Sequence, residues 1–153
     1  MKLSYFIPVL LLAATPAVAD QANVDIRANV PGTCTIEAVN PIDFGDLDQS
    51  TAAPDRTAPG DVRYWCSKGL QYTVEMGHGS NYQGNKRRMK GQANTNSSDY
   101  LPYELTANSA LGGNGRGPNT PETFRMTGKV KGPDYNAVSV GAFLDTVVIT
   151  ISP

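Results

Sequence analysis

The sequence is short of the residues that most catalytic and metal sites require. It contains one histidine, His78, and two cysteines, Cys34 and Cys66, among 153 residues. A site of three histidines or four cysteines therefore cannot be built. No Ser-His-Asp set and no pair of acidic residues stands out for acid–base work. We expect no catalytic activity and no cofactor.

Charge is also scarce: 18% of the residues are charged, and the formal net charge is −1. The chain lacks the positive field that recruits phosphates, so we expect no nucleic-acid partner. The basic cluster Lys86-Arg87-Arg88-Met89-Lys90 could contact an anionic surface or polysaccharide, but a charged edge strand is favoured. Hydrophobic residues make up 40%, which suffices for a core and excludes charge-rich disorder.

Long apolar runs are missing after the N-terminus. Lys2 precedes the apolar stretch 6–14, and Ala17-Val18-Ala19 supplies a small-residue cleavage pattern. These features predict a secretory signal peptide over residues 1–19. The stretch is too short for a membrane span. We expect a mature chain of 134 residues, beginning at Asp20, that is exported without stable insertion in a membrane.

The two cysteines both fall in the mature part. An even pair in an exported chain predicts a disulfide, here Cys34–Cys66. The alternative, a catalytic thiol, would need His78 beside it. We favour the disulfide, which would join the first strand of the domain to the second.

Strict alternation marks the start of the mature chain. Polar residues separate five apolar ones: Ala22, Val24, Ile26, Ala28 and Val30. This period of two predicts a β-strand. Similar patterns predict strands at 33–39, 61–67, 70–76, 100–106, 124–130 and 143–151, with loops over 40–60 and 108–121. Seven short strands and no helical periodicity predict an all-β antiparallel sandwich.

Several blocks occur in an order that resembles one family. They are Cys34-Thr35-Ile36, Ile42-Asp43-Phe44-Gly45, Tyr64-Trp65-Cys66-Ser67-Lys68-Gly69, Leu101-Pro102-Tyr103-Glu104-Leu105 and the segment 141–151, which begins Gly-Ala-Phe-Leu-Asp. The pattern resembles the spore coat protein U domain family, whose bacterial members include pilin subunits of archaic chaperone–usher pili. The resemblance covers nearly all of residues 20–153.

This resemblance implies an incomplete immunoglobulin-like sandwich over residues 32–153, preceded by a donor-strand extension over residues 20–31. A periplasmic chaperone would first fill the gap left by the missing strand. An outer-membrane usher would then exchange it for the extension of a like subunit. The donor side chains would be Ala22, Val24, Ile26, Ala28 and Val30, which enter the pockets of an acceptor groove. Val147, Ile149 and Ile151 are the residues expected to line that groove.

Two functions are therefore compared. The first is a pilus subunit exported through the periplasm to the cell surface, supporting adhesion and biofilm formation. The alternative is a monomeric secreted carbohydrate-binding or coat β-sandwich protein, with a sugar stacked on Trp65 or a nearby tyrosine. Residues 22–30 distinguish the two, because a monomer could use them as an ordinary first strand of its own sheet.

Overall fold

The computed structural model describes residues 19–50, 53–92 and 97–153. All of the predicted signal peptide except Ala19 lies outside these residues. The chain divides into two units, Met1–Val30 and Pro31–Pro153. In the first unit, residues 19–30 carry no helix or strand.

The second unit is built from short strands. They are β1 (Cys34–Asn40), β2 (Arg56–Cys66), β3 (Gln71–Met76), β4 (Arg87–Gly91), β5 (Tyr100–Ala107), β6 (Gly112–Asn114), β7 (Glu122–Val130), β8 (Phe143–Leu144) and β9 (Ile149–Ser152), with one helical turn, α1 (Gly132–Asn136), before β8. Every pairing between strands is antiparallel among the described residues. The predicted all-β class is confirmed.

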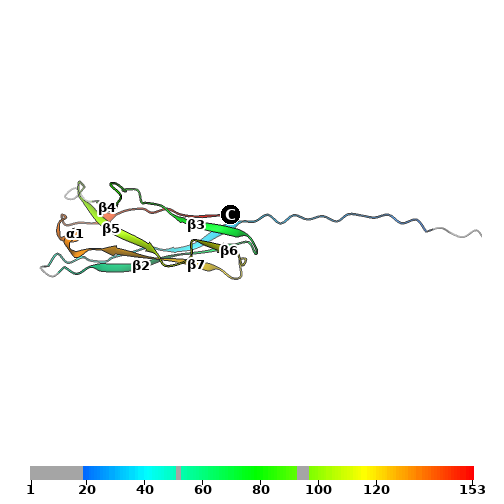
Figure 1. Cartoon of the computed structure of the whole chain (residues 1–153), viewed down its shortest axis with the longest axis horizontal. Helices are drawn as coiled ribbons and strands as arrows, with labels where there is room; N and C mark the ends of the chain where they lie inside the picture. The colour runs from blue at the N-terminus through cyan, green and yellow to red at the C-terminus, as the bar shows by residue number, and fades with distance from the viewer. Residues whose placement is uncertain (1–18, 51–52, 93–96) are drawn as a thin grey trace, which may run out of the picture. The chain divides into compact units, whose positions relative to one another are not determined.

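Two sheets form the layers of this unit. The larger has the strand order β1-β2-β7-β5-β4-β8, and the smaller has the order β6-β3-β9. Figure 1 shows β2 and β7 in one layer and β3 in the other. Alternate residues of β2 and β7 face inward, including Val62, Tyr64, Phe124 and Met126, and pack against Tyr72 and Val74 of β3.

A second apolar cluster fills the end of the unit near α1. Leu101, Val130 and Tyr135 are its buried members, and Phe44, Met89 and Phe143 pack against them at partial exposure. The α1 turn is held by the Tyr135 hydroxyl, which donates to the Pro54 carbonyl at 2.8 Å. This second cluster lies beneath the cleft described below.

The structure corrects three strand predictions. Strand β2 begins at Arg56, inside the loop predicted over 40–60, because residues 56–64 pair continuously with β7. Pro59 is tolerated there because β1 pairs only with residues 61–66, which leaves one side of β2 open. Strand β6 lies inside the loop predicted over 108–121. The single strand predicted over 143–151 is two strands, β8 and β9, which belong to different sheets.

The basic cluster is also placed differently from the prediction. Strand β4 is not the edge of its sheet, since it pairs with β5 on one side and β8 on the other. Arg87 and Arg88 are half-buried and donate to the carbonyl oxygens of Gly77 and Asn81. The Arg88 guanidinium also lies 4.2 Å from the Tyr100 ring centre. These two arginines tie β4 to the segment after β3.

Candidate functional site

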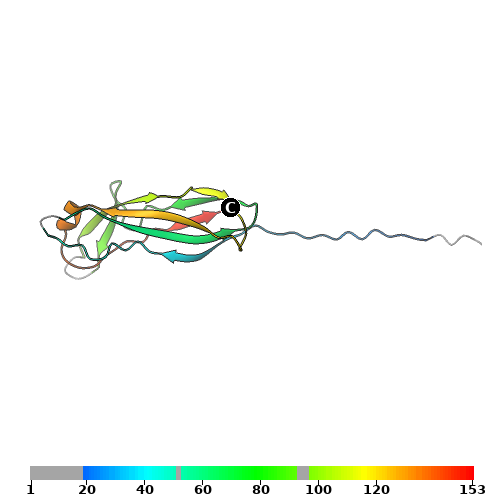
Figure 2. The ribbon, with the colours of Figure 1, turned by 90° about the horizontal axis from the view of Figure 1, so that it is seen from below.

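Two edge strands lie at the same side of the sandwich. In Figure 2, β9 (red) is the strand of the small sheet nearest to β1 (cyan), and β6 lies at the opposite side of that sheet. Both faces of β1 are open to solvent beyond Cys34: Ile36 is 47% exposed and Val39 63%. An edge strand with exposed apolar side chains and unpaired backbone groups is a template for a further strand.

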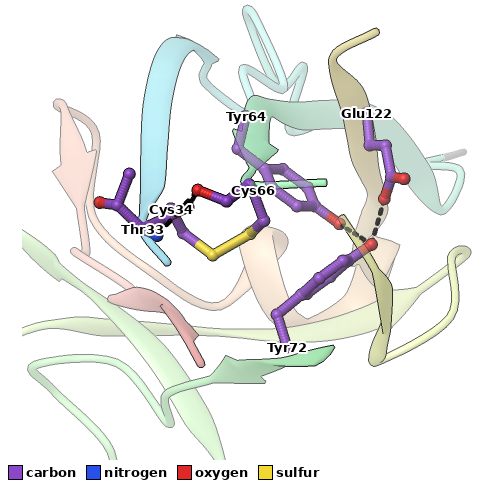
Figure 3. Close-up of a disulfide and its surroundings, with 7 residues drawn as sticks. Thr33, Cys34, Tyr64, Cys66, Tyr72 and Glu122 are labelled. Carbon is purple, nitrogen blue, oxygen red and sulfur yellow. Dashed lines mark hydrogen bonds between the residues drawn. A yellow bond between two sulfur atoms is a disulfide. The ribbon is translucent and has the colours of Figure 1, made fainter. Parts of the chain in front are cut away.

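A disulfide holds the start of β1. Cys34 lies opposite Cys66 in the β1–β2 register, and the two sulfurs are bonded (Figure 3). Thr33 and Ser67 extend the pairing, because the Ser67 backbone N–H donates to the Thr33 carbonyl at 2.8 Å. The predicted disulfide and the two strands that it was expected to join are confirmed.

Polar side chains beside the disulfide link the two sheets. The Tyr64 hydroxyl donates to the Tyr72 hydroxyl at 3.0 Å, and Tyr72 donates to the Glu122 carboxylate (Figure 3). Burial raises the pKa of Tyr72 well above its usual value, and the bond to Glu122 raises it further. Tyr72 therefore remains a neutral donor that connects β3 to β7 and β2.

The segment after β1 crosses the inner face of the large sheet. Ile42 and Phe44 lie above two glycines, Gly60 of β2 and Gly128 of β7. A β-carbon on Gly128 would come within 2.8 Å of both Ile42 and Phe44. The missing side chains at these glycines make room for the segment, so it packs against the sheet without pairing as a strand.

A cleft of about 850 Å³ opens between this segment and the chain before β8. Residues 42–49 form one wall and residues 138–143 the other, while Leu101, Met89 and Tyr135 lie at its base. A further apolar side chain in this cleft would contact the second core cluster directly. The cleft therefore has an apolar base, whereas its walls also carry Asp43, Asp46, Asp48 and Ser139.

The last segment of the chain continues from this cleft along the same side. Val147, Ile149 and Ile151 are half-buried, whereas Val148 and Thr150 between them are exposed. Ile149 and Ile151 pack against the core between the sheets. The three residues predicted to line the groove thus share the inward side of one segment, but none of them lines the cleft of 850 Å³.

Asp145 fixes the chain where it passes from one sheet to the other. Its carboxylate accepts from the Tyr103 hydroxyl at 2.6 Å, from the Asn81 backbone N–H at 3.1 Å and from the Asn81 amide at 3.0 Å. Burial and the bond to Asp145 raise the pKa of Tyr103 well above its usual value. This arrangement separates β8 from β9, a break that the continuous apolar pattern of 143–151 does not reveal.

The predicted donor side chains are all exposed. Val24, Ile26 and Val30 are 82%, 94% and 88% exposed, and Ala22 and Ala28 are exposed as well. Three large apolar side chains in one short polar–apolar alternation therefore make an amphipathic segment whose apolar side is exposed.

Sequence reasoning did not identify four residues of the open side: Ile36, Val39, Ile42 and Phe44. Their signal is present in part, since Ile36, Ile42 and Phe44 belong to two of the sequence blocks that resemble the family. What the pattern cannot show is that Gly60 and Gly128, distant in sequence, provide the space that those two side chains need.

The remaining reactive residues are the histidine and the two cysteines. His78 is exposed and stacks on Tyr82, with 4.4 Å between ring centres. Both cysteines are used in the disulfide. Across the described ranges, three or more metal-ligating side chains do not gather at any point. Nor do those ranges contain a helix with the length and apolar character of a membrane span.

Comparison with known proteins gives a family match over most of the chain. The model of the Spore Coat Protein U domain matches residues 20–150. No curated protein matches the sequence. Solved structures give a fold match: one chain of the chaperone–tip adhesion subunit pre-assembly complex from archaic chaperone-usher Csu pili of Acinetobacter baumannii is 23% identical, with a TM-score of 0.55 over 80% of the present chain.

The present chain spans only 40% of the length of that solved chain. A chaperone–tip adhesin complex of CFA/I fimbriae biogenesis is more distant, at 16% identity and a TM-score of 0.43, over 77% of the present chain and 41% of its own. The first likeness, together with the strand order, confirms the predicted immunoglobulin-like sandwich.

Proposed function

The chain belongs to the spore coat protein U domain family, and on that premise we propose that it is an exported structural subunit of a surface pilus. Subunits would polymerise by donor-strand exchange: residues 22–30 of one copy fill the open side of the next. The proposal depends on two features of one chain: an open cleft with an apolar base, and an amphipathic segment whose apolar side chains are exposed.

The dimensions of the two parts support this proposal. Residues 22–30 span nine positions, about 30 Å as a strand. The segment from Phe143 to Ile151, which follows the open side, also spans nine. The added strand would supply backbone partners at a sheet edge while its alternate side chains enter the cleft. Burying Val24, Ile26 and Val30 would contribute about 1.5–3 kcal/mol each before ordering costs.

An open apolar side also has a consequence for export. The groove would expose apolar surface during passage through the periplasm and favour aggregation. We therefore propose a periplasmic chaperone that covers it and an outer-membrane usher where exchange takes place. The completed fibre would lie at the cell surface and support adhesion and biofilm formation, a structural role and not a catalytic one.

The proposal is tested by the size of the mature protein after export with its chaperone and usher. We expect a ladder of multimers that survives detergent without heating, and fibres by electron microscopy. A variant that lacks residues 20–30 should give neither. A mature protein that remains a stable monomer with both assembly factors present would contradict the proposal.

A further inference from the structure

The structure contains a second cleft, of about 460 Å³. It is formed by the turn between β3 and β4, by β5, and by the end of β7 with the start of α1. None of its lining residues lines the larger cleft between residues 42–49 and 138–143. The two clefts can therefore be altered separately.

Cationic side chains dominate this second cleft. Four of them line it, Lys86, Arg87, Lys129 and Lys131, against two carboxylates, Glu104 and Asp134. The Lys131 ammonium lies 2.6 Å from a Glu104 carboxylate oxygen. The Lys129 ammonium lies 2.8 Å from a carboxylate oxygen of Asp55, a residue that does not line the cleft. Lys86 and Arg87 are therefore the cations left for a ligand, and the Asp134 carboxylate also lines the cleft without an ion pair among the described residues.

Those two cations lack carboxylate partners. No ion pair to Lys86 or Arg87 occurs within residues 19–50, 53–92 and 97–153. Arg87 donates from Nη2 to the Gly77 carbonyl at 2.7 Å, and its Nε is buried with no acceptor in the same part of the chain. A half-buried guanidinium without a counter-charge is stabilised when an anion binds beside it.

A rigid polar and aromatic wall stands beside these cations. Tyr82 stacks on His78, and its hydroxyl donates to the Asn85 amide oxygen at 2.6 Å. Gly84 and Asn85 have φ values of 57° and 62°, and Gln83 pairs with Lys86 across them. Two consecutive left-handed residues make a tight primed turn, which holds Tyr82, Asn85 and Lys86 together.

We propose that this cleft binds an acidic sugar unit of a polysaccharide, with the carboxylate of a uronic acid as its anchor. Lys86 and Arg87 would receive the carboxylate. The apolar face of the sugar ring would lie against the Tyr82–His78 pair, and the Asn85 amide would bind a hydroxyl. A cleft of this volume accommodates one or two sugar rings.

The charge balance favours a polyuronate over a nucleic acid. Duplex DNA carries one negative charge per about 1.7 Å, and proteins that bind it supply a matching run of cations. Here only two unpaired cations face the cleft, and the whole chain has a net charge of −1. A polymer with one carboxylate per sugar has a lower charge density than a nucleic acid, and therefore matches the small number of cations in the cleft better.

Binding at this cleft does not require polymerisation, but the proposed pilus would strengthen it. Each subunit would present one copy, and many copies on one fibre raise the apparent affinity for a long polysaccharide. The test therefore uses the mature protein as separate, unpolymerised subunits. A failure of sugar binding at the second cleft can then be distinguished from a failure of the pilus proposal.

The experiment measures binding to three probes: polygalacturonate, neutral dextran of similar length, and a single-stranded oligothymidylate. The variants are Lys86→Glu in the cleft and Lys68→Glu, which makes the same charge change at an exposed turn outside it. A Tyr82→Phe variant keeps the ring and removes the bond to Asn85. Circular dichroism establishes that each variant is folded.

We expect binding to polygalacturonate that weakens with salt, and no binding to dextran. Lys86→Glu should reduce the affinity at least tenfold, Tyr82→Phe by a smaller factor, and Lys68→Glu less than twofold. Equal losses in the two lysine variants would show attraction to net charge alone and overturn the proposal. Equal binding of dextran, tighter binding of oligothymidylate, or no binding to polygalacturonate would also overturn it.

Discussion

Individual residues fix the ends of the strands that border the open side. Cys34 is bonded to Cys66 at the start of β1, and Asp145 holds the chain between β8 and β9 through Tyr103 and Asn81. Strands β1, β8 and β9 are each at the edge of a sheet among the described residues. These bonds therefore hold strand ends that a further neighbouring strand would otherwise hold.

Removing the disulfide should lower stability strongly. The sequence separation of 32 residues corresponds to about 3.7 kcal/mol in the chain-entropy description of a crosslink. We expect the double variant Cys34→Ser, Cys66→Ser to lose about 2–5 kcal/mol in the free energy of unfolding by urea. The wild-type protein in reducing buffer is the matched control and should unfold like the variant. Unchanged stability in both would contradict this role.

Tyr103 should make stability depend on alkaline pH. Because the folded state raises its pKa above the unfolded value of about 10, the neutral form contributes stability below pH 10. That contribution is lost as the pH rises through and beyond 10. Tyr103→Phe should therefore be less stable by about 1 kcal/mol at pH 8, and the difference should shrink above pH 10. A difference that stays constant from pH 8 to 11 would contradict the account.

At the scale of elements, the alternation of polar and apolar residues predicts most of the strands. It fails for strands whose existence or bounds depend on backbone pairing with a distant strand. The central parts of β2, β3, β5 and β7 follow from their period of two, because each has one face in the core. Strand β6, three residues of Gly-Gly-Asn, exists only because β3 offers it a backbone partner. The division of 143–151 into β8 and β9 depends on the bonds of Asp145 to Asn81 and Tyr103, which are 64 and 42 positions away, and no local pattern contains them.

For the same reason, only some residues of the candidate site could be predicted from the sequence. The inward side of Val147, Ile149 and Ile151 follows from alternation, and the disulfide follows from the cysteine count. The wall formed by Ile42 and Phe44 depends on Gly60 and Gly128, whose role emerges only when three separate segments meet. The basic cluster was misplaced because charge suggested an edge, whereas its arginines bind carbonyl oxygens of a neighbouring segment.

The alternating face of residues 22–30 gives a prediction about one side chain. Ile26→Asp would place a charge in the apolar groove of the next subunit and should abolish multimers, because an unpaired buried charge is costly. Asn29→Asp adds the same charge on the other face of the strand and should leave assembly nearly unchanged. Detergent-resistant multimers are measured for both. Equal loss in the two variants would show that alternation does not determine the contact.

At the scale of the whole molecule, the chain carries a sandwich with one open side and a segment suited to close such a side. The sandwich has a disulfide, two apolar clusters and nine strands among the described residues, yet Ile36 and Val39 remain exposed at its edge. This combination supports the proposed polymerisation, in which each copy would supply what the next one lacks. The central claim is therefore that residues 22–30 of one copy bind to the open side of another copy.

The most direct test is to delete residues 20–30 and add a synthetic peptide of that sequence. We predict that the deleted protein binds the peptide in a one-to-one complex by native mass spectrometry and that its melting temperature rises. A peptide with Ile26→Asp should do neither, and one with Asn29→Asp should act like the original. If the deleted protein fails to fold even with the peptide, and the intact protein is a stable monomer, then residues 22–30 belong to the sheet of their own domain and the account is wrong.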